Sequence, residues 1–166
     1  MSQPAPEPEI SVVVAAYNEV ESLPILLGEL RPVLEATGRS WEIVLVDDGS
    51  TDGTAEAIRA AAAREGRIQA VLLAANRGQS AALAAGFAHA RGRVVVTLDA
   101  DLQNDPADLP RLLAALEGAD VVSGIRADRR DPALRLLSSR IANGFRRAVL
   151  GDPVTDIGCS FKAYRR

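Results

Sequence analysis

The chain has 166 residues, of which 48% are hydrophobic and 25% charged, a composition typical of one soluble globular domain with a substantial core. No apolar run approaches the roughly 18–20 residues needed to cross a bilayer, which argues against a membrane-spanning segment. The net charge of −3 is uneven, because residues 1–121 carry −9 and residues 122–166 carry +6. An acidic N-terminal part and a basic C-terminal part indicate two kinds of partner, although a chance distribution of surface charge would give the same pattern.

The amino terminus, MSQPAPEPE, is acidic and proline-rich and lacks the basic and apolar regions of a signal peptide. We therefore expect residues 1–9 to be a disordered lead-in. The single cysteine, Cys159, has no intramolecular partner for a disulfide and is expected to be a buried thiol. This cysteine usage favours a cytoplasmic location.

From residue 9 onward, apolar β-branched runs alternate with alanine- and leucine-rich stretches. Hydrophobic periodicity predicts strands at 9–17, 41–48, 68–75, 93–99 and 119–124. It predicts helices at 21–37, 54–65, 79–91 and 105–117, the last with Asp105 and Pro106 as its capping residues. Strands that alternate with helices and are apolar throughout predict a mostly parallel α/β sheet with helices on both faces.

The pattern changes after Gly124. Residues 125–151 are predicted to be an arginine-rich loop followed by a basic amphipathic helix. Residues 154–166 are predicted to be a loop that enters a strand.

Ligands of open α/β sheets bind outside the carboxyl ends of the strands, so the segments that follow the predicted strands form the candidate site. These segments are AAYNE (15–19), DDGSTDGT (47–54), NRGQS (76–80), DADLQ (99–103) and SGIR (123–126). Acidic, amide and arginine side chains recur in them. That convergence is a stronger indication of a site than any one of the motifs.

The apolar strand VVVTLD ends on two acids, Asp99 and Asp101, and burial of unpaired carboxylates is costly. The two carboxylates and the amide oxygen of Gln103 are spaced to face one cation. Hard oxygen ligands suit Mg²⁺ or Mn²⁺, which a diphosphate would bridge. The alternative, a helix cap, is weak because Asp105 already provides one.

The segment DDGSTDGT resembles the start of a calcium loop, but the twelfth position is Arg59 instead of the required Glu. A plainer interpretation is a turn in which Ser50 or Thr51 caps the next helix, with Asp52 and Gly53 serving local structure. This leaves the adjacent acids Asp47 and Asp48 unexplained, and one of them can accept hydrogen bonds from a nucleobase. The sequence contains neither glycine-rich phosphate fingerprint, GxxxxGK[ST] or GxGxxG.

Taken in order, YNE, DDGSTDGT, N-x-G, DADLQ and SGIR resemble the inverting family 2 glycosyltransferases of the GT-A fold. SSRIAN and GCSFKAYRR narrow the resemblance to the branch of dolichyl-phosphate mannose synthases and bacterial polyprenyl-phosphate glycosyltransferases. The resemblance implies a GT-A, Rossmann-like catalytic domain over residues 10–166. It also implies a UDP- or GDP-sugar donor, Mg²⁺ or Mn²⁺, and a polyprenyl or dolichyl phosphate acceptor at the cytoplasmic face of a membrane.

The resemblance assigns roles to particular residues. The nucleotide would be held by Ala15, Tyr17, Glu19, Val46, Asp48, Asp99 and Ala100. Asp101 and Gln103 would bind the metal, and the acceptor-side phosphate ligands would be Arg126, Arg140 and Asn143, with Arg126 reaching the donor. The implied catalytic set is Asp101, Arg126, Arg140 and a candidate base, Asp156.

Two departures from the family pattern stand out. Ala15 replaces a proline that is usual in the family, and relatives continue beyond this C-terminus with further helices. We therefore expect a catalytic domain truncated at its C-terminus or an unusually short member.

A lipid monophosphate has a second pKa near 6, so it is mostly a dianion at neutral pH and requires cations more than a strong general base. The arginine-rich segment 126–147 supplies such cations, and anionic headgroups add about 1 kcal/mol per nearby Lys or Arg. The sequence argues against nucleic acid as a partner, because no aromatic stacking residues accompany the arginines and the chain is acidic overall.

Other interpretations are weaker. A haloacid-dehalogenase-type phosphatase would require Thr or Val at position 103 and a suitably placed lysine, whereas the one lysine is Lys162. A sugar-nucleotide nucleotidyltransferase would require a glycine- and lysine-rich loop that is missing. Two alternatives stay open: a folded but inactive nucleotide-sugar-binding fragment, and a family 2 transferase with a non-lipid acceptor.

Overall fold

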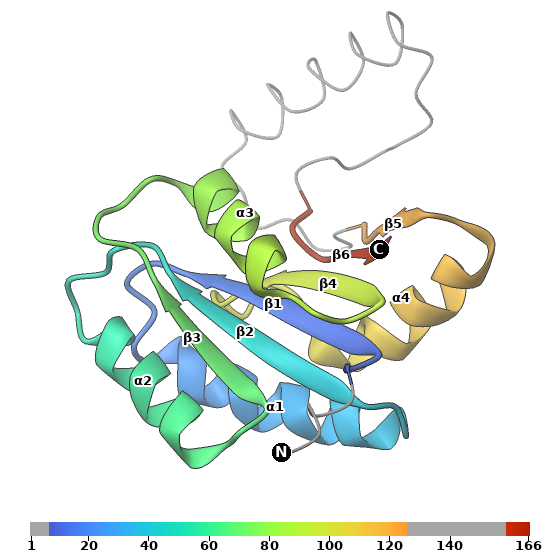
Figure 1. Ribbon diagram of the computed structural model, residues 1–166, viewed down its shortest axis with the longest axis horizontal. Coiled ribbons are helices and arrows are strands. Elements are labelled where there is room, and N and C mark those ends of the chain that lie inside the picture. Colours follow the sequence, from blue (N-terminus) through green and yellow to red (C-terminus); the bar gives the residue numbers. More distant parts are fainter. Residues whose placement is uncertain (1–6, 126–158) are drawn as a thin grey trace, which may run out of the picture.

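The computed structural model describes residues 7–125 and 159–166. In this part of the chain, a six-stranded sheet has the order β3-β2-β1-β4-β6-β5 (Figure 1). Its strands are β1 (Ile10–Ala16), β2 (Trp41–Asp47), β3 (Ile68–Leu72), β4 (Val94–Asp99), β5 (Val121–Ser123) and β6 (Lys162–Arg165). The pairs β1–β2, β1–β4 and β2–β3 are parallel, and β6 is antiparallel to both β4 and β5. The predicted mostly parallel α/β sheet is confirmed.

The helices are α1 (Ser22–Ala36), α2 (Thr54–Arg64), α3 (Gln79–His89) and α4 (Leu109–Ala115). Short 3₁₀ segments, η1 (Pro106–Asp108) and η2 (Leu116–Gly118), precede and follow α4. The Asp105 carboxylate accepts a hydrogen bond of 2.8 Å from the Ala107 amide, which is the predicted cap before Pro106. Each helix lies within its predicted range.

Two hydrophobic layers enclose the sheet, because its strands are apolar on both faces. Successive β1 residues alternate between the layers: Val12 and Val14 face one side, and Val13 and Ala15 face the other. Helices α1, α2 and α4 cover the first face, with leucines of α1 at three- and four-residue spacing, namely Leu23, Leu26, Leu27, Leu30 and Leu34. Helix α3 covers the second face (Figure 1).

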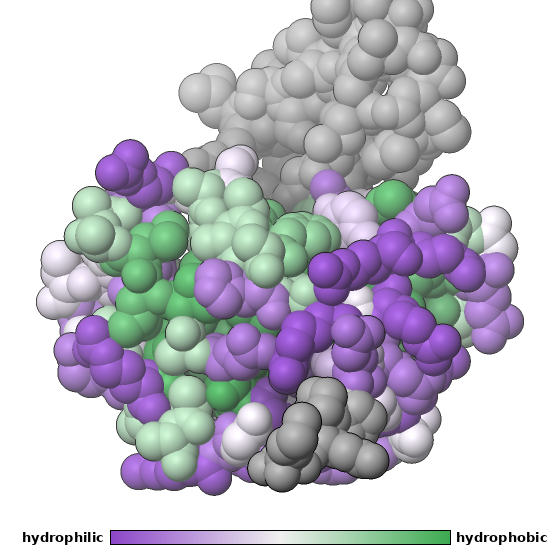
Figure 2. Space-filling view, in the orientation of Figure 1, coloured by the Kyte–Doolittle hydropathy of each residue, from purple (hydrophilic) through white to green (hydrophobic). Residues whose placement is uncertain are grey.

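Helix α3 packs closely against β1. A Cβ at Gly86 would lie 2.2 Å from Cγ1 of Val13, so the helix could not approach the strand this closely with any larger residue. The outward surface of this alanine-rich helix is the pale green region above the sheet in Figure 2. The tight packing fixes where the first residue of α3, Gln79, lies at the sheet's carboxyl edge.

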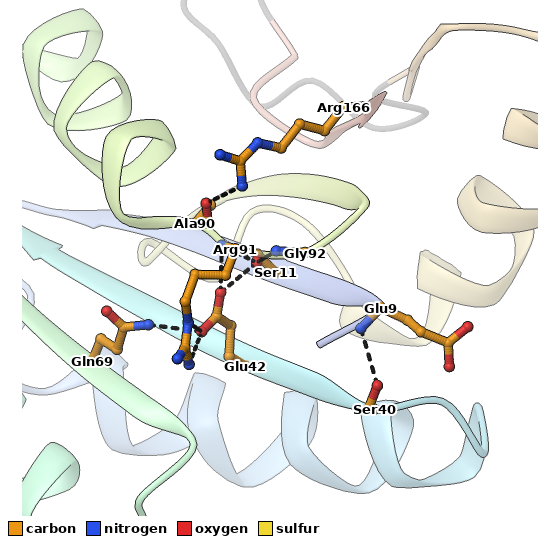
Figure 3. Close-up of polar contacts among 9 residues, drawn as sticks. All are labelled: Glu9, Ser11, Ser40, Glu42, Gln69, Ala90, Arg91, Gly92 and Arg166. Atoms are coloured by element: carbon orange, nitrogen blue, oxygen red, sulfur yellow. Dashed lines mark hydrogen bonds and ion pairs between the residues drawn. The ribbon is translucent and has the colours of Figure 1, made fainter. Parts of the chain in front are cut away.

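At the amino-terminal ends of the strands, a polar cluster forms around two buried residues, Ser11 and Glu42 (Figure 3). Its centre is Glu42 in β2, which accepts hydrogen bonds from Ser11, Gln69 and Arg91. The amide of Gly92 completes the cluster by donating to the Ser11 hydroxyl over 2.7 Å. These bonds join the start of β4 to β1 and β2.

Strand β3 is shorter than predicted, because its last ladder partner is Asp47, the final residue of β2. The chain then leaves the sheet, and the Leu73 amide donates to the Asp47 carbonyl over 2.9 Å. Strand β6 lies within the predicted segment 154–166, and the thiol of Cys159 is buried, as predicted.

The predicted basic helix and the first six residues of the lead-in lie outside the described residues. The Glu9 amide donates to the Ser40 carbonyl over 2.9 Å directly before β1. Among the described residues, no helix is both long enough and apolar enough to span a membrane.

Candidate active site

A pocket of about 230 Å³ lies where β1, β2 and β4 reach their carboxyl ends. It is lined by several residues that the sequence nominated for nucleotide or metal binding, namely Ala15, Tyr17, Glu19, Asp48, Asp99, Ala100 and Asp101. This is the edge at which parallel α/β sheets bind their ligands. The sheet therefore gathers side chains from segments that are far apart in the sequence.

The pocket is strongly acidic. Glu19, Asp48, Asp99 and Asp101 line it, and no Lys or Arg from the described residues does so. A diphosphate would be repelled from such a wall unless cations accompanied it. A bound metal, arginines from elsewhere in the chain, or both would be needed to bind a nucleotide diphosphate here.

The loop after β1 is bound to the loop after β2 by paired hydrogen bonds. Asn18 has a left-handed φ of 56°, which asparagine tolerates better than most residues. Its amide donates to Ser50 Oγ over 2.9 Å, and its side-chain Oδ1 accepts from the Thr51 amide over 2.9 Å. Beside them, Tyr17 lines the pocket with 45% of its surface exposed, so its ring is accessible to a base.

The cap of α2 differs from the prediction, because neither Ser50 nor Thr51 provides it. Asp52 binds the first turn instead: its Oδ1 accepts from the Thr54 amide over 3.0 Å and from the Thr54 hydroxyl over 2.6 Å. The hydrogen bond from the Thr54 hydroxyl is the largest cause of the lowered pKa of Asp52. The carboxylate of Asp52, which directly precedes Gly53 with its left-handed φ, thus binds the first turn of α2 in place of the hydroxyls of Ser50 and Thr51.

The adjacent acids Asp47 and Asp48 are both buried and both accept backbone hydrogen bonds. Asp47 accepts from the Ser50 amide, at 3.2 and 3.3 Å from its two oxygens. Asp48 accepts from the amides of Arg77 and Gly78, each at 2.8 Å. Asp48 lines the pocket and Asp47 does not, so Asp48 is the candidate of the two for contact with a base.

The loops after β2 and β3 also touch at Gly49. This residue has a φ of 69°, and a Cβ there would lie 2.4 Å from the Ala75 carbonyl carbon. Together with the bonds from Asp48, this close approach holds the segment 75–78 against the pocket.

The DADLQ segment turns sharply after β4. Asp99 accepts a hydrogen bond of 2.7 Å from Gln79 Nε2, and the Ala100 amide donates to the Ala15 carbonyl over 3.1 Å. Leu102 then has a φ of 58°, an unfavourable region for leucine, and the Gln103 amide donates to Asp101 Oδ1 over 3.1 Å. Strained backbone of this kind is common at functional sites.

The donor chemistry at this turn fits a divalent cation. Among the described residues, no group of three or more His, Cys, Asp or Glu side chains could hold a metal ion. Asp101 nevertheless offers hard carboxylate oxygens at the pocket wall. Mg²⁺ and ions like it commonly take one or two protein carboxylates and complete their coordination with phosphate oxygens and water.

Several nominated residues do not line this pocket. Val46 is fully buried under α3, where a Cβ at Gly86 would lie 3.2 Å from its Cγ2. Gln103 lines a separate hollow between α4 and β5. Four nominated residues, Arg126, Arg140, Asn143 and Asp156, lie outside the described residues.

The pocket is also lined by residues to which no role was assigned from the sequence, namely Ala16, Asn76, Gly78, Gln79 and Ala82. The segment NRGQS was noted because it follows a predicted strand, and that position was the available signal. None of its residues was assigned a role, because β3 lies at the sheet edge and two strands, β2 and β1, separate it from β4.

Comparisons with known proteins bear on the family and the fold. The family model described as glycosyl transferase family 2 matches residues 11–166. An undecaprenyl-phosphate 4-deoxy-4-formamido-L-arabinose transferase of Edwardsiella ictaluri is 49% identical over 94% of this chain and 49% of its own length. The chain thus spans about half the length of the curated relatives it matches.

Two solved structures have a similar fold. A mannosyltransferase from Pyrobaculum calidifontis, solved with GDP-Man and Mn²⁺, is 25% identical with a TM-score of 0.65, over 100% of this chain and 47% of its own. A glucosyl-3-phosphoglycerate synthase from Mycobacterium tuberculosis, solved with Mn²⁺, UDP-Glc and phosphoglyceric acid, is 25% identical with a TM-score of 0.72. That match covers 95% of this chain and 56% of the synthase.

Proposed function

The chain belongs to glycosyl transferase family 2, and from that premise we propose that it moves a sugar from a nucleoside diphosphate sugar to a polyprenyl phosphate at a membrane surface. The observation that carries the proposal is the acidic pocket at the carboxyl edge, where Tyr17, Asp48, Asp99 and Asp101 converge. The named function of the Edwardsiella relative supports the choice of acceptor.

In this proposal the nucleotide lies across the ends of β1, β2 and β4. Tyr17 offers a ring face and Asp48 a carboxylate to the base, and Asp99 accepts from the ribose. Each of these side chains presents an acceptor or an apolar face, which suits the N–H and O–H groups of a nucleoside. The diphosphate then lies next to Asp101.

Asp101 would hold a divalent cation that also binds the diphosphate, and Gln103 would be a second oxygen donor once its side chain turned toward the pocket. When bound, Mg²⁺ or Mn²⁺ would neutralise the charge that develops on the leaving diphosphate. The two structural neighbours solved with Mn²⁺ and a nucleotide sugar support this assignment. In this proposal Asp101 binds the cation and orients it toward the diphosphate.

The acceptor phosphate would attack the anomeric carbon as the bond from that carbon to the diphosphate breaks, with inversion at the carbon. A phosphate dianion has no proton to lose, so the chain has to supply positive charge more than a base. Arg126, Arg140 and Asn143 are the residues proposed to bind the phosphates, and Asp156 is the candidate base. Arginine suits this role because its guanidinium binds phosphate in a bidentate way.

Calorimetric titration tests the donor half of the proposal. The folded chain is titrated with UDP and with GDP in the presence of Mn²⁺, Mg²⁺ or EDTA. We expect one nucleotide to bind in a metal-dependent way and Asp101→Ala to lose at least tenfold in affinity. The control is Asp108→Ala, since Asp108 forms an exposed ion pair with Arg111 away from the pocket and should leave binding unchanged. No binding of either nucleotide to a folded chain would contradict the donor site.

Transfer to a polyprenyl phosphate in detergent tests the acceptor half. Turnover by this chain would exclude an inactive binding fragment, which is the second candidate because the chain spans about half of its relatives. Nucleotide binding without turnover would favour that second candidate. Turnover with a soluble acceptor alone would exclude the lipid.

A further inference from the structure

The segment 76–80, which leads from β3 into α3, lines the acidic pocket, and one of its side chains bonds directly to a site carboxylate. Gln79 Nε2 donates to Asp99 Oδ1 over 2.7 Å. We infer that Gln79 is a positioning residue, which orients the Asp99 carboxylate so that its second oxygen receives the ribose hydroxyls of the donor. This inference rests on the proposed function, since it assigns a further residue to the same nucleotide site.

The two oxygens of Asp99 are used differently. Oδ1 is bonded to Gln79, whereas Oδ2 has no hydrogen-bond partner among the described residues. Both residues line the pocket. A carboxylate accepts and does not donate, so the groups that suit Oδ2 are hydroxyls or N–H groups, and the ribose supplies two adjacent hydroxyls.

Gln79 is itself held in place from two sides. It is the first residue of α3, whose close packing on β1 depends on Gly86. On its other side, the amide of Gly78 donates to Asp48 over 2.8 Å. The backbone of Gln79 is thus fixed by one contact to β1 and another to the end of β2, and its side chain reaches the end of β4.

A neutral amide suits this position better than a charged donor. The pocket wall is acidic, and Asp101 two residues beyond Asp99 is the proposed metal ligand. A lysine or arginine at position 79 would place a positive charge near the proposed cation and oppose its binding. Glutamine fixes one oxygen of Asp99 and leaves the negative charge of the site unchanged.

The matched variants are Gln79→Met, which keeps the shape and removes the donor, and Gln69→Met as the control. Gln69 also donates to a carboxylate over 2.7 Å, that of Glu42, but at the opposite edge of the sheet. Gln79 is exposed, so its replacement is expected to leave the unfolding midpoint unchanged. Gln79→Ala serves as a second variant if the methionine packs into the pocket.

The readout is the affinity for the nucleoside diphosphate that the wild type binds and for its 2′,3′-dideoxy analogue, both with Mn²⁺. We expect Gln79→Met to weaken the ribonucleotide about tenfold and the dideoxy analogue less than about twofold. Adding Asp99→Ala to Gln79→Met should weaken binding no further than Asp99→Ala alone. Gln69→Met should change neither affinity.

Equal weakening of both ligands by Gln79→Met would overturn the inference, because a merely structural effect does not depend on the ribose. Unchanged binding of both would overturn it as well, while the proposed donor site would stand. If the wild type bound neither UDP nor GDP, the donor site and the inference would fail together.

Discussion

The hydroxyl of Ser11 donates to the carboxylate of Glu42 over 2.6 Å, across the pair that these two residues form between β1 and β2. Both side chains are buried, and Arg91 completes the arrangement with a bond of 2.6 Å from its Nη2 to Glu42 Oε2. Burial by itself raises the pKa of Glu42, but the hydrogen bonds from Ser11 and Arg91 together outweigh it and the pKa is lowered. The charged carboxylate is therefore the form that the fold stabilises.

Replacing Glu42 by glutamine should lower the free energy of unfolding by about 1–3 kcal/mol, because the charge and one of the two acceptor oxygens that Ser11, Gln69 and Arg91 use are lost. Urea unfolding measures the change. The control is Glu56→Gln, since the ion pair of Glu56 with Arg59 is exposed and should change stability by less than about 0.5 kcal/mol. Equal effects of the two substitutions would contradict the role given to Glu42.

The contribution of Glu42 should depend on pH. A lowered pKa in the folded state means that the stabilisation is complete above the ordinary pKa of 4.5 and is lost as the pH falls through the folded value. The difference in unfolding free energy between the wild type and Glu42→Gln should accordingly narrow below about pH 4.5. A difference that stayed constant from pH 7 to pH 3 would show that the charge of Glu42 does not matter.

The glycine at position 86 should be intolerant of alanine. A Cβ there would meet Val13 in the core, so α3 must shift, at a cost of about 1–3 kcal/mol. Gly28→Ala in α1 is the matched control, because nothing lies within 4 Å of its added Cβ and helix propensity should raise stability by about 0.5–1 kcal/mol. Thermal unfolding should show a lowered midpoint for Gly86→Ala and a raised midpoint for Gly28→Ala.

Asp48→Asn should loosen the loop that carries Gln79. An asparagine has one acceptor oxygen for the two amides of Arg77 and Gly78, so one amide would lose its partner, at about 1–3 kcal/mol. Amide hydrogen exchange at positions 77 and 78 should quicken, and nucleotide affinity should fall. Asp120→Asn, at a side chain that is 94% exposed, should alter neither exchange nor affinity.

Replacing Leu102 by glycine should stabilise the folded state. Its left-handed φ of 58° costs a leucine about 1–2 kcal/mol, so Leu102→Gly should raise the free energy of unfolding by about 0.5–1 kcal/mol and Leu102→Val should lower it. Ile25→Gly, at an exposed position of α1, should have the opposite sign, since helix interiors disfavour glycine. A loss of stability in Leu102→Gly would show that the leucine side chain, and not its backbone, determines the turn.

Local patterns predicted the elements of the described chain because each helix and strand has its own apolar periodicity. The leucines of α1 recur at three- and four-residue spacing, and the apolar run of β4 ends at Asp99, the last residue of the strand. Since parallel strands end at one edge, residues such as Tyr17, Asp48 and Asp101 could be assigned to one site before their distances were known.

Contacts between distant segments could not be predicted in the same way. Gln79 is separated from Asp99 by 20 positions, and nothing in either local sequence specifies the bond between them. The cap of α2 was assigned wrongly, because Ser50, Thr51 and Asp52 all favour such a position and the loop after β1 determines which one takes it. The place of β6 between β4 and β5 is likewise a property of the whole sheet.

The position of β6 between β4 and β5 implies an order in which the strands pair during synthesis. Strand β5 ends at Ser123, but in the described sheet it pairs with β6, which begins at Lys162 and separates it from β4. Strands β1 to β4 can pair as soon as residue 99 has left the ribosome, whereas β5 must wait for β6. The Gly124 amide then donates to the Phe161 carbonyl over 2.8 Å, a contact between distant parts of the sequence that we expect to form after the pairing of β1 to β4.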